Sequence, residues 1–193
     1  MNYVFWDSSA LRERSASALL LVACVLMFGI TAFSNSADDV QQLAGQDVKQ
    51  ALKQAEKLTK KGNLLEAERL LRAALATEPS NSRVQSSLSY VFLKQRRFLE
   101  AYTIALEAAK SDSKNSRAFA MVGMSLLSFG KFPEARALFI RSVQINNREP
   151  FAWAGMGMLD FYENRIDNSI DKLQTAEYFE NNEPDFTFAL AQV

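Results

Sequence analysis

The sequence contains no histidine, and its only cysteine, Cys24, lies inside an apolar run. The rest of the chain therefore has neither an imidazole nor a thiol. This absence excludes Cys–His and Ser–His nucleophile pairs and removes the nitrogen and sulfur ligands that zinc and copper prefer. A glycine-rich phosphate loop is also missing, because Gly155 and Gly157 fall inside a helical pattern rather than after a strand. We therefore expect no catalytic residues, no metal and no cofactor in this chain.

An excess of charge of either sign is also absent. The 22 Lys and Arg residues equal the 22 Asp and Glu residues in number, so the formal net charge is zero. A chain without excess positive charge is not steered toward nucleic acid. Its 193 residues are enough for one compact or elongated domain with a short appendage.

The most informative feature that is present is a repeat of 34 residues. The segments 48–81, 82–115, 116–149 and 150–183 align without insertion or deletion, and small residues recur in them at Ala67, Ala101, Ala135 and Ser169 and at Ala74, Ala108, Ser142 and Ala176. Each segment has two apolar-periodic stretches separated by a turn signal, at Gly62, Arg96, Gly130 and Asn164. This pattern predicts four helix–turn–helix units whose small residues let the helix axes approach closely. We therefore predict an all-α solenoid.

These segments resemble the tetratricopeptide repeat (TPR) family over residues 48–183. The family's hallmark string is similar to GNLLEAERLLRAALATEPSN at 62–81 and to GKFPEARALFIRSVQIN at 130–146, and Trp153 and Gly157 match its first-helix signature. The resemblance implies a right-handed α-solenoid of four TPR units, with residues 184–193 as an incomplete fifth repeat or a capping helix. Asp160 departs from the family pattern, because its position is normally apolar, and we expect it to pair with a nearby arginine, Arg136 or Arg165.

The resemblance also implies a binding face, because the first helices of TPR units line the concave side of the solenoid. The residues carried over to that side and predicted to contact a partner are Arg83, Tyr90, Lys94, Arg117, Met124, Leu127, Phe151, Met158, Phe161 and Tyr162. So much uncovered apolar surface is typical of a binding site, and methionine and aromatic side chains suit irregular apolar ligands. The alternative is that part of this stripe is ordinary contact between neighbouring repeats.

Residues 1–37 do not belong to the repeats. The stretch Ser15–Ala37 is uncharged, with basic residues before it and acidic residues after it. As a separate hydrophobic helix its central part would span about 27 Å, close to the apolar thickness of a bilayer. Three interpretations remain open: a cleaved signal peptide, an uncleaved membrane anchor and a lipoprotein signal ending at Cys24. All three export the repeats, with 38–47 as a polar linker, so we expect an exported protein, periplasmic or anchored in the inner membrane with its repeats facing the periplasm.

These observations predict a protein–protein interaction scaffold that presents a concave apolar groove to a partner peptide or protein in cell-envelope assembly. Two alternatives remain. The chain can be a structural subunit that forms a homo-oligomer through its apolar C-terminal end, since a solenoid normally closes with a polar cap. It can also be the N-terminal TPR portion of a longer exported protein, such as a protease-like one, whose catalytic domain would lie beyond the end of this chain.

Overall fold

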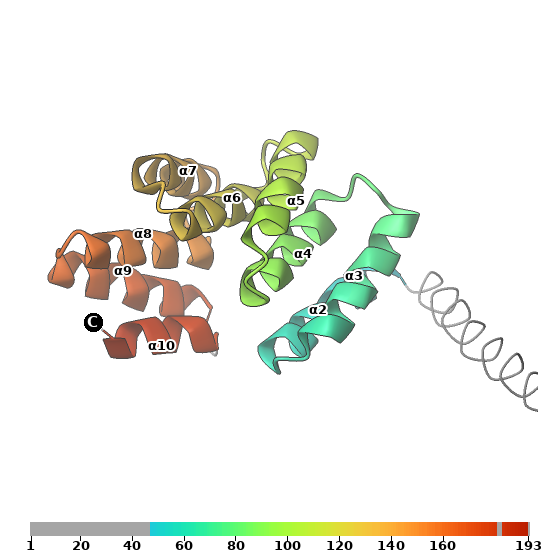
Figure 1. Ribbon diagram of the computed structural model, residues 1–193, viewed down its shortest axis with the longest axis horizontal. Helices are drawn as coiled ribbons and strands as arrows, with labels where there is room; N and C mark the ends of the chain where they lie inside the picture. The colour runs from blue at the N-terminus through green and yellow to red at the C-terminus, as the bar shows by residue number, and fades with distance from the viewer. Residues whose placement is uncertain (1–46, 181–182, 193) are drawn as a thin grey trace, which may run out of the picture. The chain divides into compact units, whose positions relative to one another are not determined.

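The structure is a computed structural model that describes residues 47–180 and 183–192. These residues form helices without any strand, arranged as successive hairpins (Figure 1). The hairpins are α2 (Val48–Lys60) with α3 (Leu64–Thr77), α4 (Ser82–Lys94) with α5 (Phe98–Ser111), α6 (Ser116–Ser128) with α7 (Phe132–Ile145), and α8 (Pro150–Tyr162) with α9 (Ile166–Phe179), followed by the single helix α10 (Pro184–Gln192). The predicted all-α solenoid of paired helices is therefore confirmed.

The predicted N-terminal hydrophobic segment, 1–37, lies outside the described residues, as does the linker except for Asp47. Among the helices that the structure describes, none has both the length and the apolar character needed to cross a membrane.

The four turns inside the hairpins share one backbone geometry. The residues with positive φ are Gly62, Arg96, Gly130 and Asn164, at 82°, 62°, 72° and 59°. In each turn the next amide donates to a carbonyl five residues earlier, as in the bond from Asn63 N to Leu58 O at 2.9 Å. This bond is typical of the Schellman motif, in which a left-handed residue ends a helix. The turn signals of the sequence thus act by the same mechanism in all four units, although Arg96 and Asn164 lack the conformational freedom of glycine.

Small residues allow the two helices of a hairpin to pack closely. Ala67, Ala101, Ala135 and Ser169 are all fully buried. A Cβ added at Gly123 would lie 2.6 Å from Cε1 of Phe139, and one added at Gly157 would lie 2.8 Å from Cγ of Leu173. Such distances are too short for carbon atoms, so these contacts require glycine in α6 and α8.

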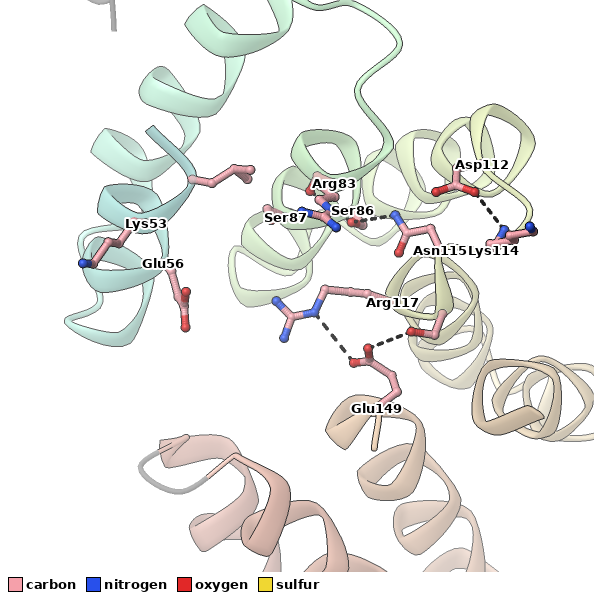
Figure 2. Close-up of a pocket in the computed structure, with 12 residues that line it drawn as sticks. Lys53, Glu56, Arg83, Ser86, Ser87, Asp112, Lys114, Asn115, Arg117 and Glu149 are labelled. Carbon is pink, nitrogen blue, oxygen red and sulfur yellow. Dashed lines mark hydrogen bonds and ion pairs between the residues drawn. The ribbon is translucent and has the colours of Figure 1, made fainter. Parts of the chain in front are cut away.

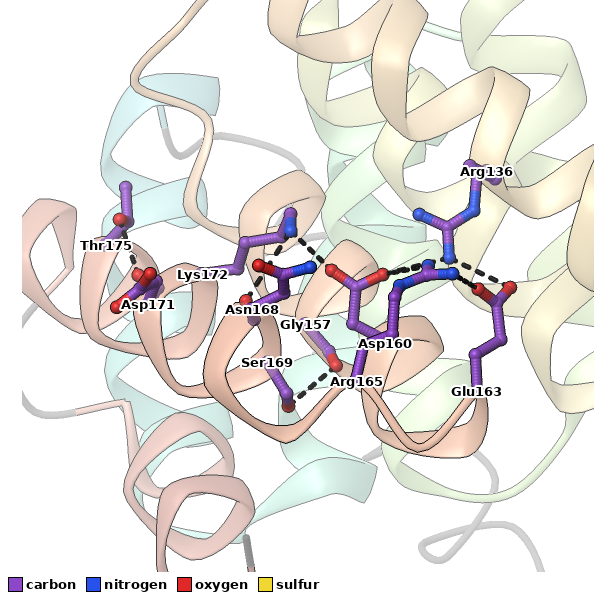
Figure 3. Close-up of polar contacts among 10 residues, drawn as sticks. All are labelled: Arg136, Gly157, Asp160, Glu163, Arg165, Asn168, Ser169, Asp171, Lys172 and Thr175. Carbon is purple, nitrogen blue, oxygen red and sulfur yellow. Dashed lines mark hydrogen bonds and ion pairs between the residues drawn. The ribbon is translucent and has the colours of Figure 1, made fainter.

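Asp160 is buried in α8 among three cations, as Figure 3 shows. Arg136 Nη2 lies 3.1 Å from Asp160 Oδ1, and Arg165 and Lys172 also pair with the carboxylate. Burial by itself would raise the pKa of Asp160, but the hydrogen bonds from Lys172 and Arg165 together outweigh it and lower the pKa below its ordinary value. The predicted pairing with arginine is thus confirmed with both candidates, and Lys172 is a third partner that the sequence did not reveal.

Candidate functional site

An apolar cavity of about 290 Å³ lies between helices of the second, third and fourth hairpins and α10. Its lining residues are Tyr90, Met124, Phe151, Met158, Phe161, Tyr162, Leu173, Asp185, Phe186 and Ala189. Six of the ten residues that the sequence placed on the binding face are in this set. The first helices α4, α6 and α8 thus bring them together from three different repeats.

The six residues are not equally accessible. Tyr162 is 63% exposed and stacks on Phe132, with ring centroids 5.4 Å apart, and Phe161 beside it is also exposed. Met124 and Met158 are half-buried. Phe151 is only 2% exposed, because the rings of Tyr90 and Phe186 pack against it, so it supports the cavity from inside rather than offering free surface.

Leu127, in contrast, does not line the apolar cavity. It is half-buried and packs against the hydrophobic core, as Met124 also does. Its role in contacting a partner stays a prediction, and the alternative of ordinary contact between repeats stays open for it.

A polar pocket of about 470 Å³ lies between α2, α4, α6 and the start of α8 (Figure 2). The predicted contact residues Arg83 and Arg117 line it. The guanidinium of Arg83 is exposed and has no ion-pair or hydrogen-bond partner within the described part of the chain. A carboxylate from another molecule can therefore pair with Arg83 without first breaking an existing contact.

Glu149 forms one wall of the polar pocket. Ser116 Oγ donates to Glu149 Oε2 at 3.2 Å, and Arg117 Nε lies 3.7 Å from Glu149 Oε1, an oxygen without a hydrogen-bond donor in the described residues. Burial raises the pKa of the Glu149 carboxyl, and the nearby charge of Arg117 only partly offsets this effect. The local sequence does not reveal that Glu149 is a buried wall of the pocket. Glu149 occupies the N-cap position of α8, where an acidic residue is expected for helix capping alone.

Three acidic residues at the end of α9 and the start of α10, Glu180, Glu183 and Asp185, contact residues of the first three hairpins. We call this set the acidic clasp. Glu180 pairs with Lys60 at 2.9 Å and with Arg117 at 3.2 Å. Asp185 pairs with Lys94 at 2.6 Å.

Tyr90 is the other contact of the acidic clasp. Its hydroxyl lies 2.6 Å from Glu183 Oε1 and 3.0 Å from Asp185 Oδ2. Burial and the two nearby carboxylates raise the pKa of Tyr90, so the hydroxyl stays protonated and acts as a donor. Burial also raises the pKa of Glu183, and the hydrogen bond from Tyr90 opposes that rise.

The acidic clasp changes the interpretation of the binding face. Tyr90, Lys94 and Arg117 were predicted to contact a partner, and each is already paired with a carboxylate of the same chain. The paired residues are 63 to 95 positions apart, so neither the repeat spacing nor a helical periodicity reveals them.

In the described residues no group of His, Cys, Asp and Glu side chains is arranged to hold a metal ion.

Four successive helix hairpins with equivalent turns are the architecture of the TPR fold, and solved structures have the same fold. PilF of Pseudomonas aeruginosa is 18% identical with a TM-score of 0.57, over 80% of this chain and 68% of that one. The Sgt2 TPR domain of Aspergillus fumigatus is 14% identical with a TM-score of 0.55, over 62% of this chain and 81% of that one. YrrB, described as a TPR protein with an unusual peptide-binding site, is 18% identical with a TM-score of 0.50, over 83% and 81% of the two chains. No family model and no curated protein matches the sequence.

Proposed function

We propose that the chain is a protein-binding scaffold whose concave face holds a segment of a partner protein. The observation that carries this proposal is the apolar cavity of about 290 Å³, which is open at Phe161 and Tyr162 and is lined by Met124 and Met158. Protein surfaces that hold apolar side chains of a partner have this composition, because thioether and aromatic groups adapt to irregular shapes. The description of YrrB as having a peptide-binding site supports the same use of this fold.

The polar pocket provides a second contact for the same segment. The guanidinium of Arg117 lies over the ring of Phe151 at 4.6 Å from its centroid, so the polar pocket and the apolar cavity adjoin at this pair. A segment with an apolar side chain in the cavity can therefore place a carboxylate or a peptide carbonyl near Arg83.

We further propose that the protein acts in the cell envelope. The support for it is the uncharged stretch Ser15–Ala37, with its basic residues on one side and acidic residues on the other. The scaffold would then be exported and would act at the membrane or in the periplasm, as part of an envelope assembly. Self-association through the C-terminal end stays a prediction.

The test is partner capture by variants of the full chain. Met124→Asp and Met158→Asp each place a charge in the apolar cavity, and we expect either to reduce partner recovery at least tenfold in cross-linking and mass spectrometry of native envelopes. The matched control is Leu65→Asp, because Leu65 is 80% exposed and lines neither pocket. Far-UV circular dichroism checks that all three variants stay helical. Equal recovery of the same proteins by the Met variants and the control would refute the role of the cavity.

A further inference from the structure

We propose that α10 acts as a resident ligand of the concave face, and that the partner segment displaces it by presenting the same chemistry. That chemistry is an acidic segment followed directly by an aromatic residue, as in Glu183–Phe186. The inference rests on the proposed function of the concave face and specifies the class of partner that the face accepts.

The contacts of α10 extend beyond what stacking of neighbouring units requires. In a solenoid each unit contacts the units beside it. Besides packing against its neighbour α9, the start of α10 contacts Tyr90 and Lys94 of α4, a helix of the second hairpin. The acidic clasp thus crosses the concave side and occupies the donors on which a partner would depend.

The residues around α10 recognise two chemical features. The first is negative charge. The Tyr90 hydroxyl donates a hydrogen bond to the Glu183 carboxylate, and the Lys94 ammonium pairs with the Asp185 carboxylate. The second is an aromatic ring: Phe186 is almost fully buried, with its centroid 5.3 Å from that of Phe151 in an edge-to-face arrangement. Charge complementarity and ring packing therefore select the same short segment.

The apolar cavity remains open beside this helix. Asp185, Phe186 and Ala189 form one wall of it, while Met124 and Met158 line other parts. A competing segment can thus repeat the contacts of α10 and also fill space that α10 leaves empty. A helix of nine residues depends on its tertiary contacts for stability, so loss of these contacts releases it.

The experiment measures binding of a fluorescein-labelled peptide, EPDFTFALAQ, to the full chain by fluorescence anisotropy. One variant of the chain, D185N with F186A, weakens the docking of its own α10 while leaving Tyr90, Lys94 and Phe151 unchanged. We expect this variant to bind the peptide at least tenfold more tightly than the wild-type chain does. The control peptide carries the same two substitutions and should not bind. In the weakened chain, adding Lys94→Met should remove the gain in affinity.

Equal binding of the peptide to the wild-type and weakened chains would overturn the proposal, and so would equal binding of the two peptides. Circular dichroism checks that each variant is folded. If the double variant does not fold, peptide binding is compared between the wild-type chain and the milder variant D185N. Light scattering tests whether α10 of a second copy of the chain occupies this surface. If the wild-type chain is a dimer that dissociates when the peptide is added, the surface binds α10 of the second copy, and the proposal of a different partner protein is overturned.

Failure of this inference differs from failure of the proposed function. If the Met124 and Met158 variants recover fewer partner proteins but the weakened chain does not bind the peptide, only the inference fails. If the weakened chain binds the peptide while those variants recover partners normally, the proposed function fails.

Discussion

Replacement of Asp160 by asparagine tests the charge cluster of the fourth hairpin most directly. The asparagine keeps the size of the side chain but removes its charge, and three cations, Arg136, Arg165 and Lys172, lose their shared carboxylate. The side chain of Asp160 is only 2% exposed, whereas those of its partners are 25% to 43% exposed. The loss in free energy of unfolding therefore depends on how far the three cations can be rehydrated.

The expected magnitude follows from these exposures. Removing one partner from a fully buried ion pair costs about 3–5 kcal/mol, and an exposed pair contributes about 0–1 kcal/mol. Because the three cations can partly rehydrate, we expect D160N to lower the free energy of unfolding by about 2–3 kcal/mol at pH 7. Urea denaturation followed by far-UV circular dichroism measures this difference.

The pH dependence gives an independent check. The pKa of Asp160 is lower in the folded chain than its ordinary value of 3.8. The folded state thus binds the proton less readily than the unfolded state, so the stabilisation is complete above pH 3.8 and declines as the pH falls through the folded-state pKa. The stability difference between wild type and D160N should accordingly shrink in acid.

The matched control is Glu163→Gln. Glu163 pairs with Arg136 at 3.0 Å and also pairs with Arg165, but its side chain is 35% exposed. We expect a loss of less than about 1 kcal/mol for this variant, because solvent screens an exposed pair. If D160N were no less stable than E163Q at pH 7, or if the deficit of D160N grew on acidification, the reasoning would be refuted.

Three further predictions concern packing, capping and the acidic clasp. Gly155→Ala should lower the free energy of unfolding by about 1–3 kcal/mol in urea denaturation, because a Cβ there would lie 2.2 Å from Cζ of Phe139, and no change in stability would contradict this packing. Asn115→Ala should cost about 1–2 kcal/mol in the same assay, since its side chain caps α6 and also bonds to α4, whereas Asn115→Asp should retain the cap. Tyr90→Phe should speed amide hydrogen exchange of α10 about tenfold or more, because a buried carboxylate loses its hydroxyl donor, and unaltered exchange would argue against the acidic clasp.

Residues of the site differ in how far the sequence could reveal them. Met124 and Met158 were found by their position within the repeat, and both line the apolar cavity. Leu127 was chosen by the same rule but does not line the cavity, because the repeat position sets the side of a helix and not which neighbouring side chains cover it. Glu149 and the acidic clasp were missed, since no local pattern distinguishes a carboxylate that ends up buried from one that stays in water.

The sequence by itself determined the four hairpins, their turns and the close approach of their helices. These features depend on contacts within about 34 residues, and the spacing of small and apolar side chains specifies them locally. Only the tertiary structure decided that Tyr90 and Lys94 of the second hairpin meet Glu183 and Asp185 near the C-terminal end. Such contacts join units that are not neighbours in the stack, so the pattern within a single repeat does not encode them.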